Sequence, residues 1–396
     1  MMQISPEIQL FIREHSSDDV RTLALQAKKY PDINMPTAIT QIAGRQVAAE
    51  KIPSWREIEE IWYPKHLSLE QCSSEITARY KARLLQGDSL TDLTGGFGID
   101  CSFLATGFKS ATYVERQEEL CEIAAHNFPI LNLNHINVRN EDGVAYLQTM
   151  SPVDCIFLDP ARRNEHGGKT VAISDCEPNV AELEALLLSK ANRVMIKLSP
   201  MLDLSLALKE LKHTQEIHIL SVNNECKELL ILLRQTSPAE IAIHCVNLLT
   251  KGTQEEQHLV FTREQEQRSQ CTYTDSLGNY LYEPNASLLK AGAFRSIAAA
   301  YPVRKLHPNS HLYTSDSFIE NFPGRIFRIV NQCSFNKKEV KENLADLKKA
   351  NVTVRNFPAT VAELRKRLHL TEGGDTYLFA STLNNGQKVI IRCEKV

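Results

Sequence analysis

The chain has 396 residues, a mass of 44.7 kDa and a formal net charge of −3. This length exceeds what one compact core usually holds and indicates two to four domains, while 43% apolar and 23% charged residues exclude a disordered or fibrous chain. No apolar run approaches the roughly 20 residues that span a bilayer, and polar and acidic residues interrupt residues 1–19, so we expect neither a transmembrane helix nor a secretory signal.

Residues 1–85 are predicted to be helical. Apolar residues recur three and four positions apart within residues 20–29, 37–50 and 69–85, and prolines separate the first two stretches from their neighbours. We expect residues 69–85 to form one helix that leads directly into the next domain.

From Ser89 onward, short apolar runs alternate with helical stretches, which is typical of βαβ units and a mainly parallel sheet. The runs are residues 89–94, 111–116, 136–140, 155–160, 193–200, 216–222 and 228–234. A short polar turn separates the last two runs and predicts an antiparallel hairpin that ends the sheet. Residues 86–237 are therefore predicted to form a doubly wound, seven-stranded α/β domain of the Rossmann type.

The remaining chain is predicted to form two small modules. Residues 238–321 begin with an irregular β-rich connection and continue from Tyr280 as a small αβ module. Residues 322–396 show the order strand, helix, strand, helix and two strands, with an Asn-Asn-Gly turn at residues 384–386 between the last two. This order predicts a compact α+β domain.

The basic residues gather at the C-terminal end. Residues 321–396 hold fourteen Lys or Arg and seven Asp or Glu, a balance of +7, and the preceding 320 residues balance at −10. A basic module on an acidic body favours a polyanionic partner, although a solvated lysine-rich helix face would give the same counts.

The cysteines and histidines bear on location and metals. Ten cysteines are scattered without a C-x-x-C pair, which argues against a zinc ribbon or a disulfide framework and favours a reducing cytoplasm. His66, His126 and His244 have no partner at metal-ligand spacing in the sequence, so we expect no metal.

The most informative motif is SLTDLTGGFGID at residues 89–100, which follows a predicted strand and precedes a predicted helix. Glycine lets a backbone turn sharply and approach a ligand closely, and the free N–H groups at a helix start suit an anionic group. An ordinary tight turn would also account for this motif if it stood alone.

Acidic residues end the next predicted strands. Glu115 ends the second strand, residues 140–142 follow the third, and Asp159-Pro160 ends the fourth. Doubly wound folds bind ligands at these carboxyl ends. Each carboxylate alone could be a helix cap, but together they favour an adenosine-bearing cofactor, with Glu115 on the ribose and Asp142 on the adenine amine.

Two adenosine cofactors are candidates, NAD and S-adenosylmethionine. A dinucleotide site requires G-x-G-x-x-G, and Cys101 stands where the third glycine would be. Asp92 precedes the glycines, where it would repel a pyrophosphate and attract a methionine ammonium. Over about residues 70–235 the motifs resemble class I S-adenosylmethionine-dependent methyltransferases.

This resemblance implies roles for particular residues. The methionine part would lie against Asp92 and the Gly95–Gly98 turn, the ribose against Glu115, the adenine against Asp142, and the reactive methyl beside Asp159. The full expected cofactor set is Asp92, Thr94, Gly95, Gly96, Gly98, Glu115, Arg116, Asp142 and Asp159. The expected catalytic residues are Asp159, Pro160 and Arg162.

The motif FLDPARR at residues 157–163 bears on the acceptor. Enzymes that methylate base amines often carry Asp-Pro-Pro-aromatic here to stack a flipped base, and this chain lacks the aromatic. RNA uracil-5 methyltransferases have Asp-Pro-Pro-Arg but need a nucleophilic cysteine, and none follows Ser199-Pro200. We expect direct transfer to a base nitrogen. Arg162, Arg163 and Lys169 would contact phosphate or base, with salt bridges to nearby acids as the alternative.

Four segments carry a wider resemblance. LEQCSSEITARYKA, DLTGGFGID, FLDPARR and YEPNASLLKAG occur in this order and resemble a bacterial methyltransferase family with a ferredoxin-like module and a C-terminal THUMP-like domain. THUMP domains in other proteins bind RNA, so the resemblance implies a tRNA or rRNA substrate. Three alternatives stay open: a protein or small-molecule methyltransferase, a non-catalytic RNA-binding protein and, least favoured, an NAD-dependent oxidoreductase.

Overall fold

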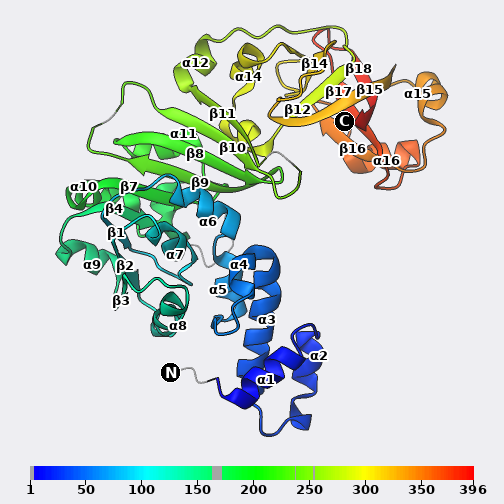
Figure 1. Ribbon diagram of the computed structural model, residues 1–396. Helices are drawn as coiled ribbons and strands as arrows, with labels where there is room; N and C mark the ends of the chain where they lie inside the picture. Colours follow the sequence, from blue (N-terminus) through cyan, green and yellow to red (C-terminus); the bar gives the residue numbers. More distant parts are fainter. Residues whose placement is uncertain (1–3, 163–171, 237, 253–254) are drawn as a thin grey trace. The chain divides into compact units, whose positions relative to one another are not determined.

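The computed structural model describes residues 4–162, 172–236, 238–252 and 255–396, except for the side chain of Arg162 (Figure 1). The chain divides into two compact units, one formed by Met1–Gln215 with Leu230–Ser237 and the other by Glu216–Leu229 with Pro238–Val396. All ten cysteines are free. Within the described ranges, no helix combines the length and the apolar character that a membrane crossing requires.

Helices form the N-terminal part of the first unit. Their bounds are Pro6–Glu14 (α1), Val20–Leu25 (α2), Met35–Lys51 (α3), Pro53–Arg56 (α4), His66–Gln71 (α5) and Glu75–Ala82 (α6), with a 3-10 turn at Ala27–Lys29 (η1). Ser5, Asp19 and Asn34 cap α1, α2 and α3 by accepting hydrogen bonds from N–H groups in the first turn. The helices predicted within residues 20–29 and 37–50 are confirmed.

The single helix predicted over residues 69–85 is wrong, because the chain forms two helices, α5 and α6, in its place. Between α5 and α6, the backbone is extended at Cys72 and at Ser74. The buried hydroxyl of Ser73 donates to the carboxylate of Asp100 at 2.7 Å and accepts from the ammonium of Lys81 at 2.8 Å. These buried polar contacts require the extended backbone, so tertiary structure overrides the local helical pattern.

Parallel strands form the centre of the first unit (Figure 1). They are Ser89–Asp92 (β1), Ser110–Glu115 (β2), Ile136–Asn140 (β3), Val153–Leu158 (β4) and Ala191–Leu198 (β7), in the order β7-β4-β1-β2-β3. The intervening helices are Ile99–Ala105 (α7), Glu118–Ile130 (α8), Gly143–Thr149 (α9), Val180–Lys190 (α10) and Leu204–Glu210 (α11). Short segments follow β4 at Ala161–Arg162 (β5), Ile173–Asp175 (η2) and Cys176–Glu177 (β6). The predicted doubly wound α/β class is confirmed.

The sheet has nine strands where seven were expected. Its order is β11-β10-β8-β9-β7-β4-β1-β2-β3. The expected hairpin is formed by Thr214–Val222 (β8) and Glu225–Leu233 (β9), and the two added strands follow it: Ala242–Leu248 (β10) and Glu256–Thr262 (β11). β10 pairs with β8 in parallel, so the β8–β9 hairpin does not end the sheet. The reason is that β10 is largely apolar and buried, and pairing it with β8 satisfies backbone groups that an edge strand would leave open.

A seven-stranded sheet occupies the C-terminal part of the second unit. Its order is β13-β14-β12-β15-β18-β17-β16. The strands are Tyr280–Pro284 (β12), Arg304–Lys305 (β13), Tyr313–Ser315 (β14), Gly324–Ser334 (β15), Asn351–Arg355 (β16), Thr376–Thr382 (β17) and Lys388–Lys395 (β18). The helices of this unit are Arg263–Arg268 (α12), Ala286–Ala291 (α13), Phe294–Ala300 (α14), Lys337–Leu344 (α15) and Val361–Leu368 (α16). The element order predicted for residues 322–396 is confirmed.

Candidate active site

The glycine turn lies directly after β1. Asp92 is 1% exposed; its Oδ1 accepts from the N–H of Thr94 at 3.0 Å, whereas its Oδ2 has no hydrogen-bond partner among the described residues. Gly96 and Gly98 have φ values of 54° and 86°. These left-handed values disfavour any side chain, so the backbone of the turn stays bare.

Packing explains the remaining glycine of the turn. A Cβ added to Gly95 would lie 2.2 Å from the ring of Tyr113, which is fully buried. The hydroxyl of Tyr113 donates to the carbonyl of Gly96, and the ring of Phe97 packs edge-on against Trp55 at 5.3 Å between centroids. The turn is therefore fixed by contacts with both Tyr113 and Trp55.

Glu115 ends β2 and contacts the same turn. Its Oε2 accepts from the N–H of Gly96 at 2.9 Å, and its Oε1 accepts from the N–H of Gln117 at 2.9 Å. The residue is 9% exposed. Each carboxylate oxygen has two lone pairs, so each retains capacity for one further hydrogen bond.

Asp159 follows β4 and joins the group. Its N–H donates to the hydroxyl of Thr94 at 2.6 Å, and its carboxylate pairs with the ammonium of Lys197 from β7. Burial raises the pKa of Asp159, and the charge of Lys197 opposes that rise. The structure thus brings Asp92, Glu115 and Asp159 together with the glycine turn, and Pro160 is buried beside them in the chain.

An ion pair between Lys81 and Asp100 is linked to Asp159 through Lys197. Asp100 was not among the expected site residues. The ammonium of Lys81 is fully buried and lies 3.0 Å from Oδ1 of Asp100, whose Oδ2 lies 3.7 Å from Lys197. Although burial alone would raise it, these two ammonium groups lower the pKa of Asp100. Asp100 is the last residue of the glycine motif, so its place in the first turn of α7 was the available signal.

As far as they are described, the other expected site residues form no hydrogen bond or ion pair with the glycine turn. Arg116 is exposed and lies 3.6 Å from the carboxylate of Glu177. Asp142 caps α9, where its Oδ1 accepts from two N–H groups at 3.0 Å each. The side chain of Arg162, and all of Arg163 and Lys169, lie outside the described residues.

The electrostatics of the site favour a cation. Burial raises the pKa of Asp92 well above its usual range, and the nearby carboxylates of Asp100, Asp159 and Glu115 raise it further. A buried oxygen without a hydrogen-bond partner destabilises the fold by roughly 1–3 kcal/mol. A cationic ligand group would relieve both penalties, so these residues fit the ammonium of a methionine moiety.

The fold is the doubly wound α/β fold found in methyltransferases, and the candidate site lies at the ends of its strands. The crystal structure of a "putative methyltransferase" from Porphyromonas gingivalis W83 is 35% identical to this chain with a TM-score of 0.88, and the match covers 100% of both chains. A family described as a ferredoxin-like domain matches residues 280–323, and one described as THUMP domain-like matches residues 324–395. The chain belongs to the bacterial family of the Porphyromonas gingivalis protein, in which a methyltransferase-type core is joined to these two domains.

Other solved structures are more distant. An rRNA methylase from Streptococcus thermophilus is 14% identical with a TM-score of 0.29, covering 40% of this chain and 93% of that one. A "putative methyltransferase" from Streptococcus mutans in complex with SAH is 12% identical with a TM-score of 0.30, covering 40% and 96%. These two likenesses are too low to support an argument about function. No curated protein matches the chain.

His244 has no partner at metal-ligand spacing along the chain, but two other histidines lie beside it in space. Its Nδ1 lies 3.2 Å from Nε2 of His258, and its ring stacks on that of His218. Sequence spacing did not indicate these neighbours because His218 and His258 are 26 and 14 residues away along the chain and meet His244 only through the pairing of three strands.

Proposed function

We propose that the protein is an S-adenosylmethionine-dependent methyltransferase that acts on a structured RNA, tRNA or rRNA, at a base nitrogen by direct transfer. The observation that carries the proposal is the buried Oδ2 of Asp92, which has no partner among the described residues and lies beside a bare glycine turn. Membership of a family that includes a "putative methyltransferase" supports it. The free cysteines favour a cytoplasmic location as part of the same proposal.

The proposed cofactor residues are those of the glycine turn and the strand ends around it. Asp92 would bind the methionine ammonium, Glu115 the ribose hydroxyls and Asp142 the adenine amine, and the remaining contacts would come from Thr94, Gly95, Gly96, Gly98 and Arg116. When bound, S-adenosylmethionine supplies an electrophilic methyl group. The chain's own task is to hold the acceptor in line with that methyl and to exclude water.

The charge of the site supports a cationic donor over its product. Four acidic side chains, those of Asp92, Asp100, Glu115 and Asp159, lie near one another. Within the described part of the chain, only two of them, Asp100 and Asp159, pair with an ammonium group, that of Lys81 or Lys197. S-adenosylmethionine carries a net charge of about +1 because of its sulfonium, whereas the product without the methyl group is neutral. The acidic surroundings therefore favour the donor and promote release of the product.

Asp159 is proposed to orient the acceptor. A neutral amine needs little acid–base help to attack a methyl sulfonium, so positioning supplies most of the rate. The Lys197 ammonium favours the ionised form of Asp159, and an ionised carboxylate can accept a hydrogen bond from an amine N–H. Pro160 and Arg162 complete the proposed catalytic set.

The RNA part of the proposal rests on the C-terminal domain. A THUMP domain-like family matches residues 324–395, and residues 321–396 have a charge balance of +7. Arg325, Arg328, Arg355, Arg365 and Arg392 are held in ion pairs. Other basic residues of this domain are exposed and form no ion pair within the described residues: Lys337, Lys338, Lys341, Lys348, Lys349 and Lys366. These lysines are available to contact phosphates.

Calorimetric titration with S-adenosylmethionine tests the cofactor site. Loss of one charged contact costs roughly 1.5–3 kcal/mol, so Asp92→Asn should weaken binding by about ten- to a hundredfold. Asp88→Asn is the matched control, because Asp88 is exposed and pairs with Lys109 at the surface. Wild-type protein that does not bind the cofactor, or an Asp92→Asn variant that binds as tightly as the control, would overturn the cofactor assignment.

Methyl transfer to RNA from cells that lack the protein tests the reaction. Asp159→Ala should abolish transfer and leave cofactor affinity within a few fold, because its role is toward the acceptor. Unchanged turnover in Asp159→Ala would contradict that role. If the protein binds the cofactor but methylates components of an RNA-depleted extract and not RNA, the protein or small-molecule alternative would be favoured. If it binds RNA but not the cofactor, a non-catalytic RNA-binding protein would be favoured.

A further inference from the structure

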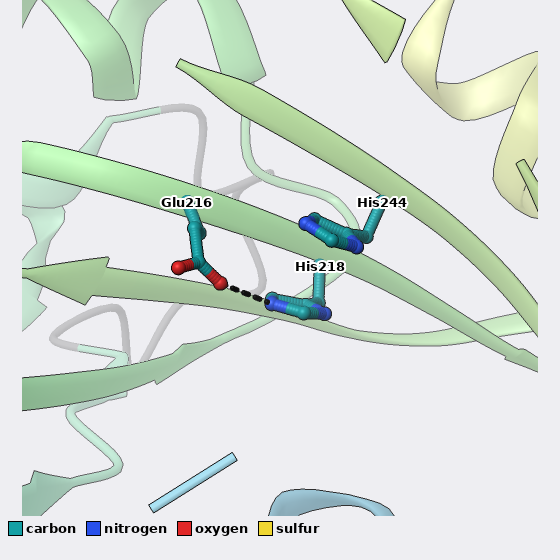
Figure 2. Close-up of side chains that lie close together, drawn as sticks. All are labelled: Glu216, His218 and His244. Carbon is teal, nitrogen blue, oxygen red and sulfur yellow. Dashed lines mark hydrogen bonds and ion pairs between the residues drawn. The ribbon is translucent and has the colours of Figure 1, made fainter. Parts of the chain in front are cut away.

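A cluster of metal-ligand side chains lies on one face of the second unit, on β8, β10 and β11, and shares no residue with the candidate active site. Alternate residues of a strand face the same side, so Glu216 and His218 of β8 share a face. His244 of β10 is the register partner of His218 and lies on that face too. Figure 2 shows the three side chains side by side.

The geometry of the cluster is compact. One ligand atom from each of Glu216, His218 and His244 lies within 4.8 Å of the others. Oε2 of Glu216 lies 3.4 Å from Nε2 of His218, and the rings of His218 and His244 stack at 4.2 Å between centroids. His258 of β11 adds a fourth group on the same face, with its Nε2 3.2 Å from Nδ1 of His244.

Imidazole and carboxylate groups are both ligands of divalent transition metals such as zinc. Imidazole nitrogen suits zinc, copper, nickel and iron, whereas magnesium and calcium prefer oxygen ligands alone. The side chains of the cluster therefore suit a divalent transition metal and not magnesium or calcium.

We propose that Glu216, His218, His244 and His258 form a binding site for a divalent transition metal of the zinc class. The stacked rings must turn about their Cβ–Cγ bonds to direct one nitrogen each at a common point, and that torsion is soft. With four protein ligands the site would be closed and structural. It would join the edge strand β11 to β10 and β8.

Zinc titration of the full-length protein tests the proposal. Chelator-treated protein should bind one Zn²⁺ per chain in competition with a chromophoric chelator, and should not bind Mg²⁺. Loss of a direct ligand should exceed the roughly 10- to 100-fold that a change of a supporting residue costs, so His218→Asn and His244→Asn should each weaken Zn²⁺ binding more than 100-fold. His369→Asn is the matched control, because His369 is exposed in the same unit and asparagine tolerates its φ of 52°.

Two further measurements distinguish the loss of a metal ligand from misfolding of the variants. Circular dichroism of the metal-free variants should match the wild type, and Glu216→Gln, which keeps all three imidazoles, should weaken Zn²⁺ binding while leaving the fold intact. Cobalt in the wild-type site should give the intense visible absorption of four-coordinate cobalt. Zinc that binds equally to wild type, His218→Asn and His369→Asn, or does not bind at all, would overturn the proposal and leave a stacked histidine cluster of purely packing origin.

Discussion

At the scale of single residues, two aspartates of one motif behave oppositely. Asp92 is buried and Asp100, eight residues later, is nearly buried, yet the pKa of Asp92 is raised and that of Asp100 is lowered. The difference comes from Lys81 and Lys197, which neutralise Asp100 and leave Asp92 surrounded by carboxylates. One motif thus supplies Asp100 for a stabilising ion pair and Asp92 for binding a cationic ligand group.

The pH dependence of stability follows from Asp100. A carboxyl with a lowered pKa stabilises the fold above its usual pKa of 3.8, and this stabilisation is lost as the pH falls toward the lower folded value. Asp100→Asn removes the carboxylate that lies 3.0 Å from the buried ammonium of Lys81, which should cost roughly 3–5 kcal/mol at neutral pH. In urea unfolding, the gap between wild type and Asp100→Asn should therefore shrink between pH 7 and about pH 3.

The exposed pair of Asp88 with Lys109 provides the comparison, because surface pairs contribute only about 0–1 kcal/mol. Asp88→Asn should change the free energy of unfolding little at either pH. An Asp100→Asn variant as stable as Asp88→Asn at pH 7 would show that the buried pair does not stabilise the fold.

At the scale of elements, the site depends on how helices begin against strand ends. α9 begins at Gly143, directly after the proposed adenine contact Asp142. A Cβ at Gly143 would lie 2.1 Å from the carbonyl oxygen of Leu93, which follows β1. Close approach of the two backbones therefore requires glycine here and sets the distance between Asp142 and the glycine turn.

Gly143→Ala should push α9 away from the end of β1. Overpacking of this kind costs about 1–3 kcal/mol, and the displaced Asp142 should weaken S-adenosylmethionine binding several-fold. Gly107→Ala is the matched control, because its Cβ would meet its nearest neighbours at an ordinary 3.7 Å. Thermal unfolding and calorimetry of both variants check the prediction, which fails if Gly143→Ala and Gly107→Ala behave alike.

At the scale of the whole molecule, the two matched C-terminal domains share one sheet. β12 lies within residues 280–323 and pairs with β15 of residues 324–395. Apolar residues from both sides, including Leu281 and Phe327, belong to one buried cluster. Deleting residues 322–396 would leave β12 without this partner, so RNA binding is better tested by removing charges than by truncation.

Replacing exposed lysines should weaken RNA binding through the loss of phosphate contacts. Lys337→Ala/Lys338→Ala should lower tRNA affinity and reduce the salt slope by roughly one per lost contact. Lys28→Ala/Lys29→Ala is the matched control, because it removes an exposed lysine pair from the N-terminal helices. Filter binding over a range of salt concentrations measures both effects. Equal slopes for the two variants and the wild type would exclude these two lysines from the interface.

The local sequence pattern by itself determined many of the secondary-structure elements and part of the candidate site. Strands β1 to β4 and β7 to β9, most helices, the glycine turn and the carboxylates at the strand ends all follow from periodicity and turn residues, which act between near neighbours in the chain. A nine-stranded sheet, the break between α5 and α6, the Lys81–Asp100 pair and the histidine cluster depend on residues far apart in sequence. Such contacts form only when strands pair and helices pack, so tertiary structure alone decided them.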